Sequence, residues 1–359
     1  MSVFDNSEYD NHEQVLFCRD TDAGLFAIIA IHDTTLGPAA GGCRMWPYAS
    51  VDDAVTDVLR LSQAMSYKNA LADLPLGGGK SVIIGDSNKD KNEKLLTSFA
   101  QFVQRLGGQY YTAEDVGIGI NDVEVLAKTS DYVFGLAATG DPSPFTARGC
   151  FEGIRAAVKH KRGRDSLEGL TVAVQGVGNV GRYVCKNLYE AGTKLIVADV
   201  NAEAVSYAVE KFGAAAVPPN KIYAQDVDIF APCAMGGTLN DNTIPQLKAS
   251  IVAGVANNQL VEPRHGRMLY NKGILYAPDY VINAGGMLNA SGDIFGQHDI
   301  NQVMERVTRL YDATLRIFEM AKQKNQPTNE VADDMARQKI VAGRSSKNDY
   351  ILPKLNKEK

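Results

Sequence analysis

The chain has 359 residues, of which 45% are hydrophobic and 22% are charged, and its formal net charge is −5. This length allows two domains with separate cores, and the acidic and basic residues are too mixed to suggest nucleic acid or an anionic membrane as a partner. No stretch reaches the roughly 18 apolar residues that span a bilayer, and the polar, acidic start is unlike a signal peptide. We therefore expect a cytoplasmic protein that binds a small molecule.

The cysteines and histidines do not indicate a metal site or disulfides. The five cysteines form no CxxC pair and lie in apolar or glycine-rich surroundings, and the five histidines lack ligand spacing. Such cysteines are typical of reduced, mostly buried thiols. We expect no metal.

Strand and helix patterns alternate in the first half of the chain, which is typical of an α/β fold. The patterns predict a buried strand at 25–32, a capped helix from Ser50 to Lys68, a strand from Ser81, a helix over 91–108 and a short strand at 109–111. A stretch rich in turn-forming residues follows at 139–149, and we expect the chain to cross between domains near Asp141.

The second half predicts a parallel sheet followed by helices. Apolar runs at 227–234, 250–259 and 274–286 each end in small or amide residues, as expected for parallel strands whose carboxyl ends face one crevice. We expect Asn257 and Asn283 to lie at such strand ends, where each could bind the cofactor ribose or substrate, or simply serve a turn. A long helix is predicted over 299–323, and a second from Thr328.

A dinucleotide fingerprint stands in its full context after the strand at 170–174. Gly176, Gly178 and Gly181 follow that strand and open a helix, and Asp199 ends the next strand 18 residues after Gly181. The glycines would serve a tight turn, backbone approach to the pyrophosphate and close helix packing, while the helix N-terminus, with Asn179 and Val180, receives the phosphates. Asp199 can accept hydrogen bonds from ribose hydroxyls and would repel a 2′-phosphate, so NAD is favoured over NADP. The alternative is a doubly wound domain whose glycines only serve a turn.

The stretch LPLGGGKSVIIG at 74–85 resembles a phosphate-binding loop only superficially. Leu74 occupies the place of the first glycine, and the residues after Lys80 predict a strand where that loop opens a helix. A lysine in a glycine-rich, apolar loop is a poor candidate for a solvated charge on the protein surface. Burial and a second nearby ammonium would lower its pKa, so Lys68 or Lys80 could act as a base near neutral pH, and Asp115 is a third candidate in the same half of the chain. Taken singly, Lys68 and Asp115 are also compatible with surface positions.

Several motifs in the same order resemble one enzyme family. They are GPAAGGCRMW, MSYKNALADLPLGGGKSVI, YTAEDVG, DPSPFTARG, VQGVGNVG, VANNQL and DYVINAGG. Over nearly the whole chain the sequence is similar to those of the amino acid dehydrogenases of the glutamate, leucine, phenylalanine and valine family, and it most resembles the leucine members.

The resemblance implies a fold of two α/β domains. The first, residues 1–142 with about 325–359, would bind substrate, carry the catalytic residues and form a homo-oligomer between dimer and octamer. The second, residues 143–324, would be a Rossmann domain for NAD, and the C-terminal helices would return to the first domain.

The resemblance also implies the roles of individual residues. Lys80 would be the base that activates water, Lys68 would hold the substrate α-carboxylate, and Asp115 would exchange a proton with the substrate nitrogen. Thr146 and Asn283 match positions near the nicotinamide, and Asn257 matches one near its ribose. The implied reaction is reversible oxidative deamination of an L-amino acid to a 2-oxo acid, ammonia and NADH.

The residues that match the family's side-chain pocket are apolar. They are Ala40, Gly41, Met65, Ala113, Met287 and Ala290. Glutamate-specific relatives carry a lysine and a serine at the positions of Ala40 and Ala290, so a second substrate carboxylate would be buried here without a partner, and we exclude glutamate. One methylene in such a pocket changes binding by only about 1 to 3 kcal/mol, so we expect broad specificity. Branched-chain substrates come first and aromatic ones second. For each of these residues, plain core packing is the alternative.

Two other functions remain open from the sequence. One is a non-enzymatic protein that responds to NAD on the same scaffold, which the presence of Lys68, Lys80 and Asp115 disfavours. The other is a phosphoryl-transfer enzyme, which the failed phosphate-loop match disfavours.

Overall fold

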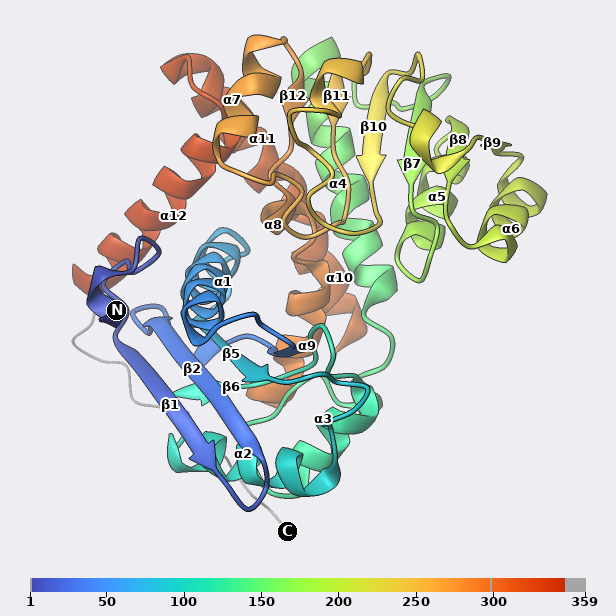
Figure 1. The fold of residues 1–359 in the computed structure, drawn as a ribbon. Helices are drawn as coiled ribbons and strands as arrows, with labels where there is room; N and C mark the ends of the chain where they lie inside the picture. The colour runs from blue at the N-terminus through green and yellow to red at the C-terminus, as the bar shows by residue number, and fades with distance from the viewer. Residues whose placement is uncertain (1, 298, 346–359) are drawn as a thin grey trace. The chain divides into compact units, whose positions relative to one another are not determined.

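The computed structural model describes residues 2–297 and 299–345, which divide into two compact units (Figure 1). Of these residues, the first unit comprises 2–140, 290–297 and 336–345, and the second comprises Asp141–Asn289 and Asp299–Met335. Within the described residues, no helix is both long and apolar enough to cross a membrane. The functional domain ranges given above stay a prediction.

A mixed sheet forms the centre of the first unit. Its strands are β1 (Gln14–Asp20), β2 (Leu25–Asp33), β3 (Ala39–Ala40), β4 (Cys43–Trp46), β5 (Gly77–Ile84) and β6 (Tyr110–Tyr111). They run in the order β1-β2-β5-β3-β6, with β4 also paired to β5; β1, β2 and β5 are antiparallel neighbours, and β3, β4 and β6 join in parallel. The strand at 25–32 is confirmed, but the strand predicted from Ser81 begins four residues earlier, at Gly77.

Helices cover both faces of this sheet. They are α1 (Val51–Leu71), α2 (Glu93–Arg105) and α3 (Ile120–Ala127), with short 3-10 helices η1 (Val3–Asp5) and η2 (Ala137–Thr139). In Figure 1, α1 lies on one side of β2 and β5, and α2 and α3 lie on the other. Two apolar clusters on opposite faces of the sheet support this arrangement. Val58 of α1 packs with Ile28 and Val82 on one face, and Phe99 of α2 packs with Ile29 and Ile83 on the other. Ser50 caps α1 as predicted, since its Oγ accepts from the Asp53 amide at 3.1 Å.

The glycines of β5 allow α1 and β6 to approach the strand closely. A Cβ at Gly78 would lie 2.2 Å from the amide nitrogen of Ser66 in α1. A Cβ at Gly79, on the opposite face, would lie 2.6 Å from the ring of Tyr110. Side chains at these positions would push the flanking elements away, so the glycines are needed for packing.

The second unit is built on an all-parallel sheet. Its strands are β7 (Thr171–Gln175), β8 (Lys194–Ala198), β9 (Ala215–Ala216), β10 (Ile229–Pro232), β11 (Ile251–Val252) and β12 (Leu275–Tyr276). The order β12-β11-β10-β7-β8-β9 is that of a doubly wound Rossmann sheet. The predicted parallel strands are confirmed, although β11 and β12 are only two residues long.

Helices of the second unit flank this sheet. They are α4 (Ser143–Arg162), α5 (Gly181–Glu190), α6 (Ala202–Phe212), α7 (Arg264–Asn271), α8 (Asp279–Ile282), α10 (Ile300–Thr308) and α11 (Leu310–Lys324), with 3-10 helices η3 (Pro219–Lys221) and η4 (Ile244–Gln246). Helices α9 (Gly285–Phe295) and α12 (Thr328–Ser345) each begin in the second unit and end in the first. The end of α12 is tied to the first unit by Arg344, whose Nη2 donates to Asp33 Oδ2 at 2.7 Å. The two-domain α/β fold with a returning C-terminal helix is therefore confirmed.

Two predictions about this unit are wrong. The single helix over 299–323 is broken at Arg309, whose amide bonds to the carbonyl three residues back, at Arg306 (3.2 Å), in a tight turn. Asn283 follows helix α8 and not a strand. Pro278 explains this, because its ring lacks the amide that would continue a sheet and its φ of −56° suits the entry to a helix.

Candidate active site

Lys80 lies in the middle of β5, paired with Ala30 of β2. Its side chain is only 7% exposed, and its Nζ lies 2.9 Å from Oδ1 of Asp115. The expectation that Lys80 sits in a loop is wrong, because the glycines before it belong to the strand. The strand ladder therefore holds the backbone of Lys80 rigidly.

Asp115 is presented by a tight turn after β6. The amide of Ile118 donates to the Asp115 carbonyl at 2.9 Å, and Gly117 adopts a φ of +81°, which favours glycine. A Cβ at Gly42 would lie 3.1 Å from Cβ of Asp115, so Gly42 leaves room for this side chain. The structure thus brings the GGC, GGGK and AEDVG motifs together around one ion pair.

Arg44 of β4 is a member of this site that the sequence reasoning missed. Its Nε donates to Oδ2 of Asp115 at 2.8 Å, and its Nη1 donates to Oδ2 of Asp57 at 2.9 Å. A signal was present: Arg44 is the one charged residue between the apolar Cys43 and Met45, both of which are buried. A charge in such a strand needs a buried partner.

The charges around Asp115 determine its ionisation. Burial alone would raise the pKa of this carboxyl, but the ammonium of Lys80 and the guanidinium of Arg44 outweigh burial and hold the pKa well below its usual value. Asp115 is therefore a carboxylate at neutral pH.

Most predicted substrate residues of the first unit lie on or beside strands β3 and β6 and on helix α1. A Cβ at Gly41 would lie 3.0 Å from Cγ of Met65, so these two positions are in contact. Lys68 is half-buried on α1, three residues after Met65. Ala40 is paired with Gly78 of β5 and is fully buried, and Ala113, whose carbonyl accepts from the Cys43 amide at 2.9 Å, is 6% exposed. Their roles in binding stay predictions.

The two remaining predicted pocket residues lie on α9. Met287 belongs to the second unit and Ala290 to the first, and both are half-buried. One turn after Ala290, the carboxylate of Asp293 accepts hydrogen bonds from the amides of Gly135 at 2.7 Å and Leu136 at 3.1 Å. These bonds anchor the end of α9 within the first unit.

The fingerprint glycines of the second unit have three different surroundings. Gly176 has a φ of +94°, and Gly181 lies so close to Gly176 that a Cβ would be 2.1 Å from its carbonyl oxygen. A Cβ at Gly178 would meet nothing within 4 Å. Gly176 and Gly181 are thus needed for the turn itself, whereas Gly178 borders open space that suits a pyrophosphate. Asn179 is exposed there, and Val180 is the N-cap residue of α5.

Asp199 lies directly after β8 and is held against the fingerprint loop. Its Oδ2 accepts from the Val177 amide at 2.7 Å, and its Oδ1 accepts from the Asn201 amide at 2.9 Å. A carboxylate has about four acceptor positions. Asp199 therefore keeps lone pairs that fit ribose hydroxyls.

Asn257 and Asn283 come together in the second unit. Nδ2 of Asn283 donates to Oδ1 of Asn257 at 2.8 Å and to the carbonyl of Val255 at 3.2 Å. This fixes the amide and leaves Oδ1 of Asn283 buried without a partner among the described residues. Such an acceptor fits an N–H donor from a ligand. Thr146 lies beside Gly286, three residues after Asn283, because a Cβ at Gly286 would lie 2.6 Å from its Oγ1.

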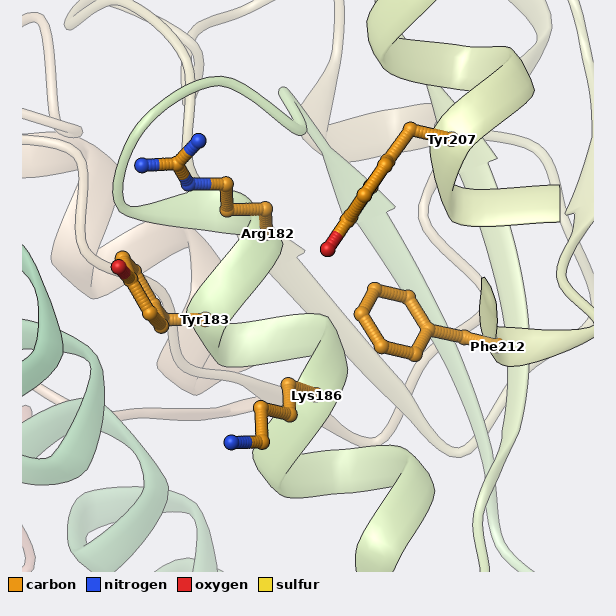
Figure 2. A pocket seen from close by; sticks show the side chains of 5 residues that line it. All are labelled: Arg182, Tyr183, Lys186, Tyr207 and Phe212. Atoms are coloured by element: carbon orange, nitrogen blue, oxygen red, sulfur yellow. The ribbon is translucent and has the colours of Figure 1, made fainter. Parts of the chain in front are cut away.

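Other features of the described residues do not add to this site. No group of three or more His, Cys, Asp or Glu side chains within residues 2–297 and 299–345 could hold a metal ion. Four of the five cysteines are buried, Cys233 is half-buried, and all five are free thiols. A surface hollow of about 230 Å³ on α5 and α6 is lined by Arg182, Tyr183, Lys186, Tyr207 and Phe212 (Figure 2), none of which was predicted for the site.

The fold and these sites define a class of protein. A Rossmann unit with a complete fingerprint is joined to an α/β unit that carries a buried lysine–carboxylate pair, as in a two-domain oxidoreductase. Comparison with known proteins then identifies the family.

The family profile described as "Glu/Leu/Phe/Val dehydrogenase, dimerisation domain" matches residues 12–132, and the profile "Glutamate/Leucine/Phenylalanine/Valine dehydrogenase" matches residues 141–204 and 200–346. A leucine dehydrogenase of Geobacillus stearothermophilus is 52% identical over 98% of this chain and 96% of its own length. A leucine dehydrogenase of Bacillus subtilis is 49% identical over 98% of this chain and 97% of its own. The crystal structure of L-tryptophan dehydrogenase from Nostoc punctiforme matches with a TM-score of 0.83 and 46% identity, covering 93% and 97% of the two chains.

The chain therefore belongs to the Glu/Leu/Phe/Val dehydrogenase family and is an amino acid dehydrogenase.

Proposed function

We propose that the protein catalyses the NAD-dependent, reversible oxidative deamination of an apolar L-amino acid, with leucine, valine and isoleucine as the first substrates. The products are the 2-oxo acid, ammonia and NADH. The observation that carries the proposal is the contact of the buried Lys80 side chain with Asp115, with Nζ 2.9 Å from Oδ1. The similarity to two leucine dehydrogenases at 49% to 52% identity supports the choice of substrate.

Three residues of the protein act on the substrate. Lys68 orients the substrate by binding its α-carboxylate, and Asp115 takes up a proton from the substrate nitrogen and later returns one. NAD bound at the fingerprint loop would supply the acceptor for the hydride that leaves the substrate α-carbon. Lys80, acting as the neutral amine, then takes a proton from the water that adds to the imine carbon. Asp115 returns its proton to the nitrogen, so that breaking the carbon–nitrogen bond of the adduct releases ammonia. Because Lys80 and Asp115 are in contact, protons on the water and on the nitrogen exchange within one small cluster.

The preference for NAD is attributed to Asp199 and the fingerprint loop. The open flank of Gly178 leaves space for the pyrophosphate at the N-terminus of α5. The negative charge of Asp199 would repel the 2′-phosphate of NADP. Oδ1 of Asn283, buried without a partner among the described residues, offers an acceptor for the nicotinamide amide or the substrate. Asn257 is bonded to the same side-chain amide, and Thr146 is assigned to the nicotinamide as well.

Substrate selection is attributed to the absence of a charge partner. Ala40 and Ala290 can form no ion pair with a side-chain carboxylate, and burying one unpaired would cost several kcal/mol, so glutamate is excluded. Phenylalanine or tryptophan is the second candidate, supported by the likeness to L-tryptophan dehydrogenase at 46% identity. A cytoplasmic location and a homo-oligomer between dimer and octamer stay predictions from the sequence.

The test is an initial-rate panel of the twenty amino acids with NAD and with NADP. We expect NADH formation with leucine, valine and isoleucine at alkaline pH, weaker rates with aromatic substrates, and none with glutamate. Higher kcat/KM for phenylalanine or tryptophan would favour the second candidate. Inactivity on every apolar amino acid, with NAD binding still seen by calorimetry, would refute the enzyme and favour an NAD-responsive binding protein.

A further inference from the structure

We propose that Arg44 is a positioning residue for Asp115: anchored on Asp57, it holds one carboxylate oxygen of Asp115 so that the other oxygen faces Lys80. The inference rests on the proposed function, because it concerns how Asp115 is prepared for proton exchange with the substrate nitrogen.

The geometry divides the Asp115 carboxylate between two cations. Nε of Arg44 is 2.8 Å from Oδ2, and Nζ of Lys80 is 2.9 Å from Oδ1. A rotation of the carboxylate about its Cβ–Cγ bond would break both contacts. The planar guanidinium presents its donors in a rigid fork, with Nε on Asp115 and Nη1 on Asp57, so it holds the two carboxylates at a fixed spacing in a way that a flexible ammonium does not.

Asp57 of α1 is the anchor for Arg44. Its Oδ2 accepts from Nη1 of Arg44 at 2.9 Å and from the Tyr48 hydroxyl at 2.6 Å, and its Oδ1 accepts from Nη2 of Arg60 at 3.2 Å. The side chains of Arg44 and Asp57 are 18% and 13% exposed. The guanidinium of Arg44 is therefore bonded to two carboxylates, and its position does not depend on Asp115 alone.

The thiol and hydroxyl groups around Asp115 are uncharged, so the two cations determine its ionisation. Burial raises the pKa of the Cys43 thiol on β4 to about 12, and burial likewise raises the pKa of the Tyr110 hydroxyl on β6 and of the Tyr48 hydroxyl. These groups stay neutral in an ordinary assay. The charged groups on the adjoining elements are Lys80 on β5, Arg44 on β4, and Asp57 and Lys68 on α1.

Loss of Arg44 therefore has two separable consequences. Without its charge, the pKa of Asp115 rises, so the acid limb of the kcat/KM profile moves to higher pH, because the substrate ammonium needs a charged Asp115 as its proton acceptor. Without the guanidinium fork of Arg44, the Asp115 carboxylate is misaligned. We expect kcat to fall about 10-fold to 100-fold, since small displacements of reacting groups lower the rate by such factors. A purely structural role would lower the melting temperature without moving the pH profile.

The experiment compares Arg44→Gln and Arg44→Lys in the full-length protein, by pH profiles of kcat and kcat/KM with leucine and NAD. Arg44→Gln should lower kcat and shift the acid limb upward. Arg44→Lys keeps the charge but cannot bridge both carboxylates, so it should lower kcat with little shift. The matched control is Arg60→Gln, because Arg60 contacts the same Asp57 but its side chain is 52% exposed. This control should retain the wild-type profile.

Each outcome decides between the two claims. An inactive wild type refutes the proposed function. An active wild type with Arg44→Gln at the wild-type rate and pH profile, or with the same change in Arg60→Gln, overturns the role of Arg44. If Arg44→Gln does not fold, Arg44→Lys against Arg60→Lys decides: a loss of kcat confined to the first supports the role, and equal rates overturn it.

Discussion

Single residues in this protein owe their chemistry to their immediate partners. Asp115 would have a raised pKa from burial alone, yet two cations reverse the direction. Asp199 is oriented by two backbone amides, which leave its outward lone pairs for a ligand. In both cases a carboxylate is held in one orientation before any ligand binds, which removes an entropy cost from binding.

Asp199→Ser tests the cofactor preference at the residue scale. The change removes the negative charge but keeps an acceptor oxygen, so kcat/KM with NAD should fall about 10-fold, while the ratio of NADP to NAD activity rises. The measurement is the initial rate with each cofactor at saturating leucine. Asp226→Ser, an equal change of charge at an exposed position, is the control. An unchanged cofactor ratio in Asp199→Ser would contradict the assignment.

At the scale of elements, close approaches of backbone determine where the glycines stand. The turn between β7 and α5 closes on itself at Gly181, while Gly178 in the same turn borders open space. Two glycines of one motif thus serve different purposes, one for the fold and the other for a ligand.

A matched pair of alanine variants separates these purposes. Gly181→Ala should destabilise the second unit by about 1 to 3 kcal/mol, because the new Cβ would meet the carbonyl of Gly176, and overpacking typically costs that much. Gly178→Ala should leave the melting temperature close to wild type and weaken NAD binding. Thermal unfolding and NAD calorimetry on both variants provide the measurement. Equal losses of stability in the two would show that the distinction is false.

The sequence predicts the local parts of these elements well and the non-local parts poorly. The fingerprint and the Ser50 cap are defined by residues close together in the chain, and both match the structure. The start of β5 at Gly77 depends on α1 and Tyr110 packing against bare backbone, which glycine propensity alone predicts as a loop. Arg44 was missed because its partners Asp57 and Asp115 are 13 and 71 residues away. The break at Arg309 leaves the helical period almost intact, so periodicity does not reveal it.

For the whole molecule, the proposed catalytic residues belong to the first unit and the proposed cofactor loop to the second. The first unit contains a buried histidine pair that the proposed function does not use. The rings of His12 and His32 lie 4.8 Å apart, and Nε2 of His12 is 3.0 Å from both the Leu59 carbonyl and the Ser62 hydroxyl. Burial first, and then the positive charge of His32, lower the pKa of His12 from 6.5 to about 4.

Stability should consequently depend on pH through His12. Between pH 6.5 and about 4 the unfolded chain binds a proton that the folded His12 does not, so unfolding becomes easier as pH falls through this window. The loss is at most about 3 kcal/mol. His12→Gln should flatten the dependence of the melting temperature on pH in this range. A slope identical to that of the wild type would show that His12 is protonated equally in both states.

The most direct measurement is leucine-dependent NADH formation by Lys80→Ala, with NAD binding followed by calorimetry on the same preparation. Without the buried amine at residue 80, water cannot be activated, so kcat should fall about 1,000-fold or more while the affinity for NAD stays within about 2-fold. Lys94→Ala, which removes a lysine of the same unit bonded to the Asp22 carbonyl, should retain the wild-type rate. Turnover of leucine by Lys80→Ala at a rate near that of Lys94→Ala would contradict the assignment of Lys80 as the base.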